Sequence, residues 1–508
     1  MTSGQICIMI AIVTYLAMMV IIGVLYSKKT KNVGDFYLGG RKLGPFVTAM
    51  SAEASDMSSY LLMGLPGLAL AAGLAEVSWT VIGLAVGTYL NWLIVAKKLR
   101  KYSERIGAIT IPDYFSLRYR ESKNILMALA AIMIIIFFVP YTASGFAACG
   151  KLFGTLFGVD YHIAMIVSAI IIVGYTSLGG FNAASTTDFI QAIIMTVALL
   201  IVLVFGVAKA GGPAAVIDNA QNLSGYLNLF QGHDPATNTA GTFGFIPIIS
   251  TLAWGLGYFG MPHILLRFMA IENPEKVKLS RRVATVWVVI SMAVAVMIGV
   301  VGLAMVNNGT LPAFDDSETI IIQISNYLST HGVVPALIAG VILAGILAST
   351  MSTADSQLLA ASSAASENVL GGLLKINLTD TGKMVVARVT LIIISVIGVV
   401  IAWDSNSSVF GIVSFAWAGF GATFGPVMLL SLFWRRSNKY GAIAGMIAGG
   451  IMVFLWKYKI AGMADVLNIY ELLPAFLTGL VINIIVSLIT KAPDDRVTAV
   501  FDEIKNNK

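Results

Sequence analysis

Two carboxylates lie inside one of the apolar stretches of the chain. Between Ser51 and Gly64 the sequence reads SAEASDMSSYLLMG, so Glu53 and Asp56 stand among serines and a tyrosine. Charge in a membrane-spanning helix costs at least ~2.5–3.5 kcal/mol on insertion scales, so acids there are functional candidates. The serines, with Gly64 and Pro66, indicate an interrupted helix that frees carbonyls for cations and a half-helix N-terminus for anions. For the serines alone, close helix packing is the alternative.

A second interruption is rich in aromatic residues and glycine. Residues 253–263 read AWGLGYFGMPH. They contain a formal G-x-G-x-x-G, but a dinucleotide site needs a preceding strand and a βαβ unit, so we reject that interpretation. Trp254 and Tyr258 are four residues apart and share one face if the segment is helical, and Pro262 ends or kinks it. An aromatic packing face is the alternative.

Hydroxyl side chains form a third polar cluster, in residues 348–357, which read ASTMSTADSQ. Ser349, Ser352, Thr353 and Ser356 recur at helical spacing and line one face with hard oxygen donors. Such neutral oxygens suit Na⁺ or another hard cation, whereas soft metals favour Cys or His. Hydroxyls that merely bond to the preceding turn are the alternative for this cluster alone.

The composition sets the class of protein that carries these clusters. Of the 508 residues, 57% are hydrophobic and only 11% are charged, against about 25% charged in an average soluble domain. We therefore predict a polytopic membrane protein of the all-α class. Cys7 and Cys149 give neither a disulfide framework nor a metal cluster, and the four histidines show no ligand spacing.

About thirteen apolar stretches are long enough to cross a bilayer core of ~30 Å. They cover 5–26, 44–72, 75–96, 124–150, 162–182, 188–208, 244–266, 284–306, 333–360, 385–403, 409–433, 440–458 and 472–490. An odd number places the termini on opposite sides. The connecting segments are too short to hold a soluble catalytic domain, which argues against an enzyme and against any organic cofactor.

The basic residues predict the orientation. With the loops assigned alternately, all but four of the 32 Lys and Arg lie on the side of the C-terminus; the exceptions are Lys151, Lys209, Lys457 and Lys459. The positive-inside rule places the N-terminus outside and the C-terminus in the cytoplasm of a plasma (inner) membrane protein. Because these cations flank separate spans, they do not indicate a nucleic-acid partner. The first span lacks a basic n-region and is predicted to be a retained helix.

Several motifs together resemble one known family. They are GGRKLGPFVTA at 39–49, ASDMS at 54–58, LLMGLPG at 61–67, WGLGYFG at 254–260, PHIL at 262–265, RFMA at 267–270, MST at 351–353 and FAWAGFGA at 415–422. The chain is similar in register, along essentially its whole length, to the sodium/solute symporter family, and most to the sodium/proline symporters within it.

The resemblance implies a LeuT-like fold with inverted five-helix repeats in a single transmembrane domain spanning 1–508. An extra N-terminal helix, 5–26, would precede repeat one at about 44–208 and repeat two at about 244–433. Additional helices at about 440–490 and a cytoplasmic tail at 491–508 would follow. The two interrupted helices would then be the first of each repeat, where symmetry-related broken helices are expected.

The resemblance also implies functional residues by position. Sodium would bind the carbonyls of Ala54, Met57 and Ser349 and the hydroxyls of Ser352 and Thr353. Ion coupling would involve Asp56 and Asp188. The solute would contact Ser58, Tyr141, Trp254, Tyr258 and Pro262. Apart from the resemblance, Arg41 in the GGR motif is a candidate gating residue on the cytoplasmic side, with a role in topology alone as the alternative. Aromatic walls suit an apolar ring with a charged nitrogen, and a half-helix N-terminus suits a carboxylate.

Three residues depart from the pattern of close sodium/proline symporters. Glu53, Tyr60 and Met261 stand where Gly, Trp and Gln are expected. Glu53 adjoins the predicted sodium site, so it either brings a proton or second cation into coupling or pairs with a basic residue on another helix. The predicted function is Na⁺-coupled uptake of L-proline. The alternatives are another small amino or organic acid as the solute, or a transporter-like nutrient sensor.

Overall fold

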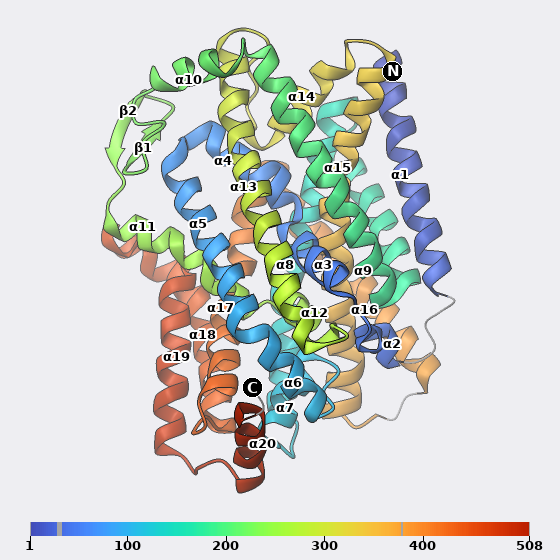
Figure 1. Cartoon of the computed structure of the whole chain (residues 1–508), viewed down its shortest axis with the longest axis vertical. Helices are drawn as coiled ribbons and strands as arrows, with labels where there is room; N and C mark the ends of the chain where they lie inside the picture. The colour runs from blue at the N-terminus through green and yellow to red at the C-terminus, as the bar shows by residue number, and fades with distance from the viewer. Residues whose placement is uncertain (1, 28–32, 377–378, 507–508) are drawn as a thin grey trace.

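The computed structural model describes residues 2–27, 33–376 and 379–506, and these form a bundle of long helices (Figure 1). The apolar helices are α1 (Ser3–Ser27), α3 (Pro45–Ser59) with η2 (Tyr60–Gly64) and α4 (Leu65–Ala72), α5 (Leu74–Leu90) with η3 (Asn91–Ala96) and α6 (Lys97–Arg105), α8 (Ile125–Phe157), α9 (Tyr161–Lys209), α11 (Phe245–Leu252) with η4 (Ala253–Phe259) and α12 (Pro262–Ala270), α13 (Val277–Asn307), α15 (Val333–Ser363) with η7 (Ala364–Leu373), α16 (Asp380–Ile401), α17 (Val409–Phe433), α18 (Lys439–Leu455) with η8 (Trp456–Ile460), and α19 (Leu472–Ile489).

Shorter elements lie in the connections. They are α2 (Val33–Leu38), η1 (Gly39–Arg41), α7 (Ile111–Arg118), α10 (Pro213–Gln221), the antiparallel hairpin of β1 (Gln231–Asp234) and β2 (Thr239–Thr242), η5 (Pro274–Lys276), η6 (Ser317–Thr319), α14 (Ile320–Ser329), η9 (Ala461–Met463), η10 (Asp465–Leu467) and α20 (Asp495–Asn506). The all-α prediction therefore holds apart from one small hairpin.

The long apolar helices confirm a multi-pass membrane protein. Within the described residues, ten helices are long and apolar enough to cross a bilayer, or eleven if Phe245–Phe259 and Pro262–Ala270, bent by 45°, form one span. Neither of two further predicted spans is among these helices. The stretch at 44–72 is interrupted at Ser58, and the helix Tyr161–Gly174 is shorter than a full span. The count of thirteen stays a prediction.

One helix boundary differs from the sequence prediction. The spans predicted at 162–182 and 188–208 correspond to two helices within α9 that meet at a kink at Gly180 (φ 65°, ψ −178°), without the predicted loop between them. A left-handed φ favours glycine, and a Cβ there would press on the Phe36 ring. The two helices thus join at a kink, which apolar periodicity does not distinguish from a loop.

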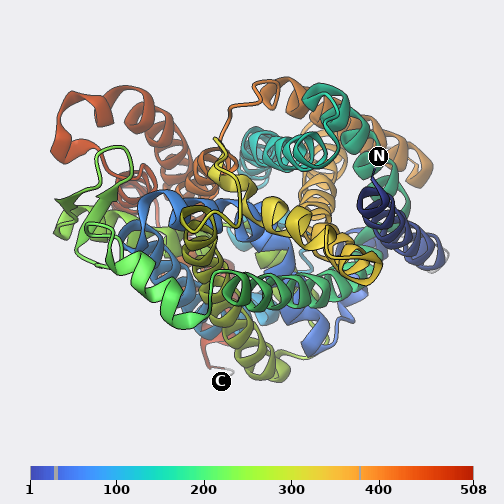
Figure 2. The ribbon, with the colours of Figure 1, turned by 90° about the horizontal axis from the view of Figure 1, so that it is seen from above.

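The two termini lie at opposite ends of the bundle, the N-terminus at the top of Figure 1 and the C-terminus at the bottom. We call these the upper and lower ends. α1 lies at one edge beside α15 and α9, and α18 and α19 pack together at the other edge, as the view from above shows (Figure 2). The interior is formed where α3 meets α8, α9, α13 and α15, with α17 packed on α8 and η4.

The interrupted helices are joined at one end. Leu43, just before α3, forms a parallel β-bridge with Ile271, just after α12. The Leu43 amide donates to the Ala270 carbonyl at 3.2 Å, and the Glu272 amide donates to the Leu43 carbonyl at 3.0 Å. Backbone groups outside helices need partners, and each chain supplies those of the other. The start of one interrupted helix is therefore fixed to the end of the other.

Candidate functional site

The first predicted interruption is present and falls on one residue. Ser58 has φ 47° and ψ −167°, so it leaves the helix, and the chain resumes helical geometry at Ser59. The Ser58 hydroxyl accepts a hydrogen bond from the Tyr60 amide at 3.2 Å, as an N-cap residue does. A break of this kind frees carbonyls before it and amides after it. The whole segment from Ser51 to Gly64 is buried.

The second interruption is built differently. η4 is a 3₁₀ turn, Met261 is extended (φ −74°, ψ 108°), and α12 starts with Pro262. Proline suits this first helical position because its missing amide hydrogen would be unpaired there anyway. Gly257 lies against the Trp417 indole so closely that a Cβ would overlap it. The prediction that glycine and proline loosen this helix is confirmed.

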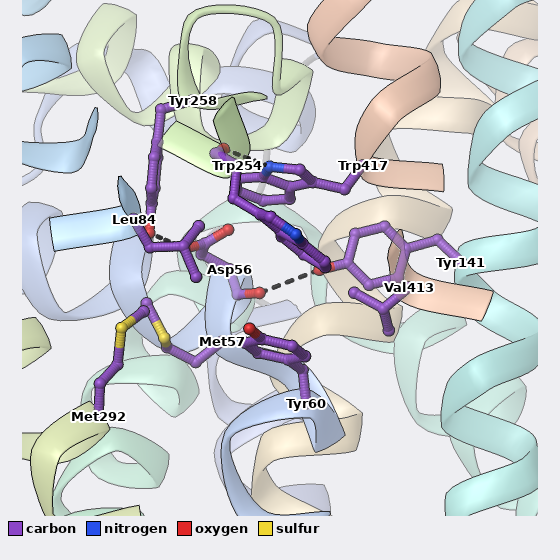
Figure 3. Close-up of a pocket in the computed structure, with 10 residues that line it drawn as sticks. All are labelled: Asp56, Met57, Tyr60, Leu84, Tyr141, Trp254, Tyr258, Met292, Val413 and Trp417. Atoms are coloured by element: carbon purple, nitrogen blue, oxygen red, sulfur yellow. Dashed lines mark hydrogen bonds between the residues drawn. The ribbon is translucent and has the colours of Figure 1, made fainter. Parts of the chain in front are cut away.

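Both interruptions line one central cavity, shown in Figure 3. Asp56 projects into it. One of its carboxylate oxygens, Oδ2, accepts from the Tyr258 hydroxyl at 2.7 Å, and its backbone carbonyl accepts from the Tyr141 hydroxyl at 3.0 Å. The other oxygen, Oδ1, has no hydrogen-bond partner among the described residues. The cavity measures about 10 Å³, room for about one water, so a solute must widen it.

Aromatic rings surround Trp254 at this cavity. Its ring centroid lies 5.5 Å from that of Tyr60, 5.4 Å from Phe410 and 4.9 Å from Tyr470. The Trp417 indole donates to the Trp254 carbonyl at 2.8 Å. Tyr60, one of the three departures, therefore keeps an aromatic ring stacked on Trp254. Met261, another departure, is fully buried but is not among the cavity-lining residues.

The predicted sodium ligands converge between α3 and α15. The Ser352 hydroxyl lies 2.9 Å from the Ala54 carbonyl and 3.2 Å from the Ser349 carbonyl, and the Thr353 hydroxyl lies 3.1 Å from the latter. These three hydrogen bonds link four of the five predicted oxygens. Met57, the fifth predicted ligand, is buried one helical turn after Ala54 on α3. The cluster consists of neutral hard oxygens, the type that suits Na⁺.

Asp188 does not line the cavity and instead belongs to a separate buried ion pair. Its Oδ2 accepts from the Ser51 hydroxyl at 2.6 Å and from the Arg267 guanidinium at 2.8 Å. Arg267 also donates to the Ser356 hydroxyl at 2.6 Å. The sequence prediction counted Arg267 among loop charges, which is wrong: it lies in α12 and is 1% exposed. A charge that deep requires its partner, so both members hold α12 to α3 and α9.

Glu53 accepts hydrogen bonds from two neutral groups on the next helix. Its Oε1 lies 2.9 Å from the Trp92 indole nitrogen and 3.1 Å from the Thr88 hydroxyl. No ion pair is formed by Glu53 with the described residues. The alternative that Glu53 pairs with a basic residue is therefore wrong. Glu53 also stays outside the cavity lining, one helical turn from Asp56.

Arg41, at the end of η1, lies beside the joined ends of the interrupted helices. Its guanidinium donates to the Ser103 hydroxyl at 3.0 Å and to the carbonyls of Met269 at 2.6 Å and Ala108 at 2.5 Å. Burial, together with the nearby Arg100 guanidinium, lowers the pKa of Arg41 to about 10, so it remains charged at neutral pH. The contacts connect η1 to α6, to α12 and to the segment after α6, and the gating role of Arg41 stays a prediction.

The structure brings together much of the predicted solute site but not all of it. Tyr141, Trp254 and Tyr258 line the central cavity, whereas Ser58 and Pro262 do not. Of the other lining residues, sequence reasoning named Tyr60 only as a departure from the family pattern and missed Leu84, Met292, Val413 and Trp417 altogether. Trp417 lies within the motif FAWAGFGA, so an aromatic residue inside a span was available as a signal. The other three are aliphatic or methionine side chains, which nothing in the pattern separates from core.

The chain is similar to a family of sodium:solute symporters and to proteins named as proline transporters. The model of the family described as "Sodium:solute symporter family" matches residues 36–449. The high-affinity proline transporter PutP of Bacillus subtilis is 41% identical over 490 residues, which cover 96% of this chain and 99% of that protein. The osmoregulated proline transporter OpuE of the same organism is 40% identical, with 96% and 95% covered. A sodium/proline symporter of Staphylococcus aureus is 37% identical, with 99% and 96% covered.

Solved structures show the same fold. A substrate-bound, outward-open Na⁺-coupled sialic acid symporter superposes with a TM-score of 0.78 at 18% identity, covering 96% of this chain and 99% of the other. Mhp1, a nucleobase-cation-symport-1 family transporter, gives a TM-score of 0.55 at 12% identity, covering 94% and 96%. The LeuT-like architecture implied by the sequence resemblance is thereby confirmed. This chain belongs to the sodium:solute symporter family.

Proposed function

We propose that this protein is a secondary active symporter that couples inward movement of Na⁺ to uptake of L-proline by alternating access. The observation that carries the proposal is the central cavity between two interrupted helices, where Asp56 faces aromatic rings beside a cluster of hard oxygens. Relatives named as proline transporters, similar over nearly their whole length, support proline as the solute.

In this proposal Na⁺ binds the oxygens of Ala54, Met57, Ser349, Ser352 and Thr353. The break at Ser58 interrupts the backbone ladder of α3, and carbonyls beside such a break can ligate a cation. Since these oxygens come from α3 and α15, the ion would hold the two helices together and organise the adjacent cavity. Asp56, Asp188 and Glu53 are proposed as the acids of the ion path, with Asp56 nearest the solute.

Proline would bind with its ring against Tyr141, Trp254 and Tyr258. An apolar ring packs on aromatic faces. Its charged nitrogen is attracted to the faces of the rings by cation–π interaction, and it can pair with Asp56 Oδ1, which has no partner among the described residues. Ser58 and Pro262 do not line the cavity, so we propose that they affect the solute by fixing the two helix breaks that shape it. We expect Trp254→Ala and Tyr258→Ala to lose proline binding while Na⁺ still raises the melting temperature. Normal affinity in both variants would remove the rings from the site.

The proposed orientation has the upper end outside the cell and the lower end in the cytoplasm, from the distribution of Lys and Arg. Arg41 would then act on the cytoplasmic side. One Na⁺ moving inward through about 100 mV releases ~2.3 kcal/mol. Tenfold accumulation of a neutral solute requires ~1.4 kcal/mol, so the voltage alone supports a gradient of roughly fortyfold.

The deciding experiment is uptake of labelled L-proline into proteoliposomes that contain the purified protein. An inward Na⁺ gradient is compared with a K⁺ gradient and with a proton gradient. Accumulation only with Na⁺ is the expected result. If proline does not accumulate while Na⁺ still raises the melting temperature, the ion site stands and the solute assignment fails.

Two other functions make different predictions in the same assay. A symporter for another small amino or organic acid would accumulate that solute, and the solute would outcompete proline for binding. A nutrient sensor would bind its ligand without concentrative flux. Concentration of a bound solute inside the vesicles therefore separates transport from sensing.

A further inference from the structure

Tyr60 brings an unpaired hydroxyl to the central cavity. The side chain is 3% exposed and lines the cavity, and its hydroxyl has no hydrogen-bond partner among the described residues. Figure 3 shows this hydroxyl directed into the cavity. Buried polar groups are nearly always paired, and leaving one unpaired costs free energy. A group that enters the cavity is therefore expected to pair with it.

The ring of Tyr60 is packed tightly, which fixes where its hydroxyl lies. The ring stacks on Trp254, with centroids 5.5 Å apart and planes at 24°, and it lies 5.5 Å from the Phe410 ring at 31°. A Cβ added at Gly64 would come within 3.2 Å of the ring, so the backbone there also lies close to it. In a close-packed interior a tyrosine hydroxyl moves only with its ring. The hydroxyl therefore stays at the cavity.

The other tyrosine hydroxyls at the cavity are already bound to protein. Tyr258 donates to Asp56 Oδ2 at 2.7 Å, and Tyr141 donates to the Asp56 carbonyl at 3.0 Å. The aliphatic and methionine side chains of the lining offer no hydrogen-bond donor: Met57, Leu84, Met292 and Val413. Tyr60 stands where tryptophan is expected. The exchange replaces an indole, which only donates, by a smaller ring whose hydroxyl both donates and accepts.

The position of the Tyr60 hydroxyl selects the part of the solute that it meets. Asp56 Oδ1 is the proposed partner of the amine, and a carboxylate is expected at the start of the half-helix after Ser58. Amine and carboxylate share one carbon of an α-amino acid, so both lie at the break in α3. The Tyr60 ring extends from the backbone and stacks on Trp254, against which the ring of proline is proposed to pack. Its hydroxyl therefore faces the ring of the solute.

We infer that the Tyr60 hydroxyl recognises a hydroxyl group on the ring of the solute, so that the protein takes hydroxylated prolines such as 4-hydroxy-L-proline as well as proline. Each of the two hydroxyls can donate or accept, so either can supply the hydrogen of the bond between them. Proline itself has a methylene group at this ring position and leaves the Tyr60 hydroxyl to a water. Tyr60 thus determines specificity for ring substituents. This inference rests on the proposed symport of proline.

The test compares solutes that differ at one ring carbon. They are L-proline, 4-hydroxy-L-proline and 4-methyl-L-proline, the last two with the substituent on either face of the ring. Their dissociation constants are measured separately, by titration calorimetry on the purified full-length protein in Na⁺. A methyl group is similar in size to a hydroxyl but forms no hydrogen bond. We expect one hydroxyproline epimer to bind about twofold to tenfold more tightly than the methyl analogue of the same geometry, the effect of one neutral hydrogen bond.

Tyr60→Phe removes only the hydroxyl and keeps the ring. The affinity for that hydroxyproline epimer, relative to proline, should fall about twofold to tenfold. Tyr470→Phe is the matched control, because the Tyr470 ring also stacks on Trp254, at 4.9 Å, but its hydroxyl donates to the Ser414 carbonyl at 2.6 Å. The ratio of the two affinities should be unchanged in the control, even if both fall. If Tyr60→Phe does not fold, the comparison of hydroxyl with methyl in the wild type decides alone.

The outcomes separate this inference from the proposed function. If wild type binds proline in Na⁺ but binds neither hydroxyproline epimer more tightly than its methyl analogue, or if Tyr60→Phe leaves the ratio unchanged, recognition of a ring hydroxyl is refuted and proline symport stands. If wild type binds hydroxyproline but not proline, and Tyr60→Phe weakens that binding, the recognition stands and the proline assignment fails. If neither solute binds, both are overturned.

Discussion

The two interrupted helices meet at one cavity but supply it with different chemistry. The break in α3 falls on a single serine, close to the carboxylate of Asp56 and to the Ala54 carbonyl that the Ser352 hydroxyl of α15 contacts. The break between η4 and α12 presents rings and glycines, packed on α17. The first interrupted helix therefore supplies mainly electrostatic contacts, and the second supplies mainly packing contacts, although both line the same cavity.

This difference separates the effects that substitutions should have. Polar groups at the first break are satisfied by other helices, so removing one changes how an ion or a charged part of the solute is held. Apart from the Tyr258 hydroxyl, which donates to Asp56, the rings at the second break contact aromatic neighbours, so changes there act mainly through packing. Substitutions at the first break should therefore change the Na⁺ dependence of transport, and substitutions at the second break should change the affinity for the solute.

The largest expected effect is that of Asp56→Asn. Asparagine keeps an acceptor for the Tyr258 hydroxyl but removes the charge at the cavity. Truncating one partner of a buried charged contact costs about 2–5 kcal/mol, so Na⁺-driven proline uptake should fall about 30-fold to more than 1,000-fold. Initial rates in proteoliposomes, at matched protein content, measure this. Uptake within threefold of wild type would show that the charge is not needed.

Gly257→Ala tests the second interrupted helix, where we expect substitutions to act through packing. A Cβ at this position overlaps the Trp417 indole, whose N–H holds the Trp254 carbonyl. Overpacking of this kind costs about 1–3 kcal/mol, so we expect a lower melting temperature and weaker proline binding with the Na⁺ dependence unchanged. Gly174→Ala is the control, because no atom lies within 4 Å of a Cβ there. Equal effects of the two substitutions would contradict the packing argument.

Ser352→Ala tests the oxygen cluster that the first interrupted helix forms with α15. The variant loses a hydroxyl that lies 2.9 Å from the Ala54 carbonyl across the α3–α15 contact. A single neutral hydrogen bond is worth about 0.5–1.5 kcal/mol, so the Na⁺ concentration for half-maximal uptake should rise about twofold to tenfold. Ser363→Ala on the same helix is the control, since the hydrogen bond that its hydroxyl forms among the described residues is to the Ala360 carbonyl of its own helix. A Na⁺ requirement that changes equally in both would exclude Ser352 as a specific ligand.

The sequence predicted the local features of both helices well. Polar residues in an apolar stretch located the break in α3, and Pro262 located the start of α12. Helix periodicity cannot report contacts between distant segments, so it missed the Asp188–Arg267 pair and the packing of Trp417 on Gly257. The sequence prediction placed Arg267 in a loop, because a lone cation at the end of an apolar span can be either a buried residue or a charge that flanks the membrane.

Glu53→Gln is the prediction with the smallest expected effect. The side-chain oxygen of glutamine still accepts from Trp92 and Thr88, so α3 should remain fixed to α5 and η3, and uptake should be retained. Only the charge one turn before Asp56 is removed. If Glu53 is an acid of the ion path, the dependence of uptake on Na⁺ or on pH shifts by a few fold, measured as initial rates over both variables.

Glu53→Gly supplies the contrast, because it removes the charge together with both hydrogen bonds and adds backbone freedom within a helix. A glycine variant with a lower melting temperature, beside a glutamine variant with normal stability, would assign the structural role to the two hydrogen bonds. If both variants keep the Na⁺ and pH dependence of wild type, Glu53 takes no part in ion coupling. The charge function of the first interrupted helix would then rest on Asp56 alone among its two acids.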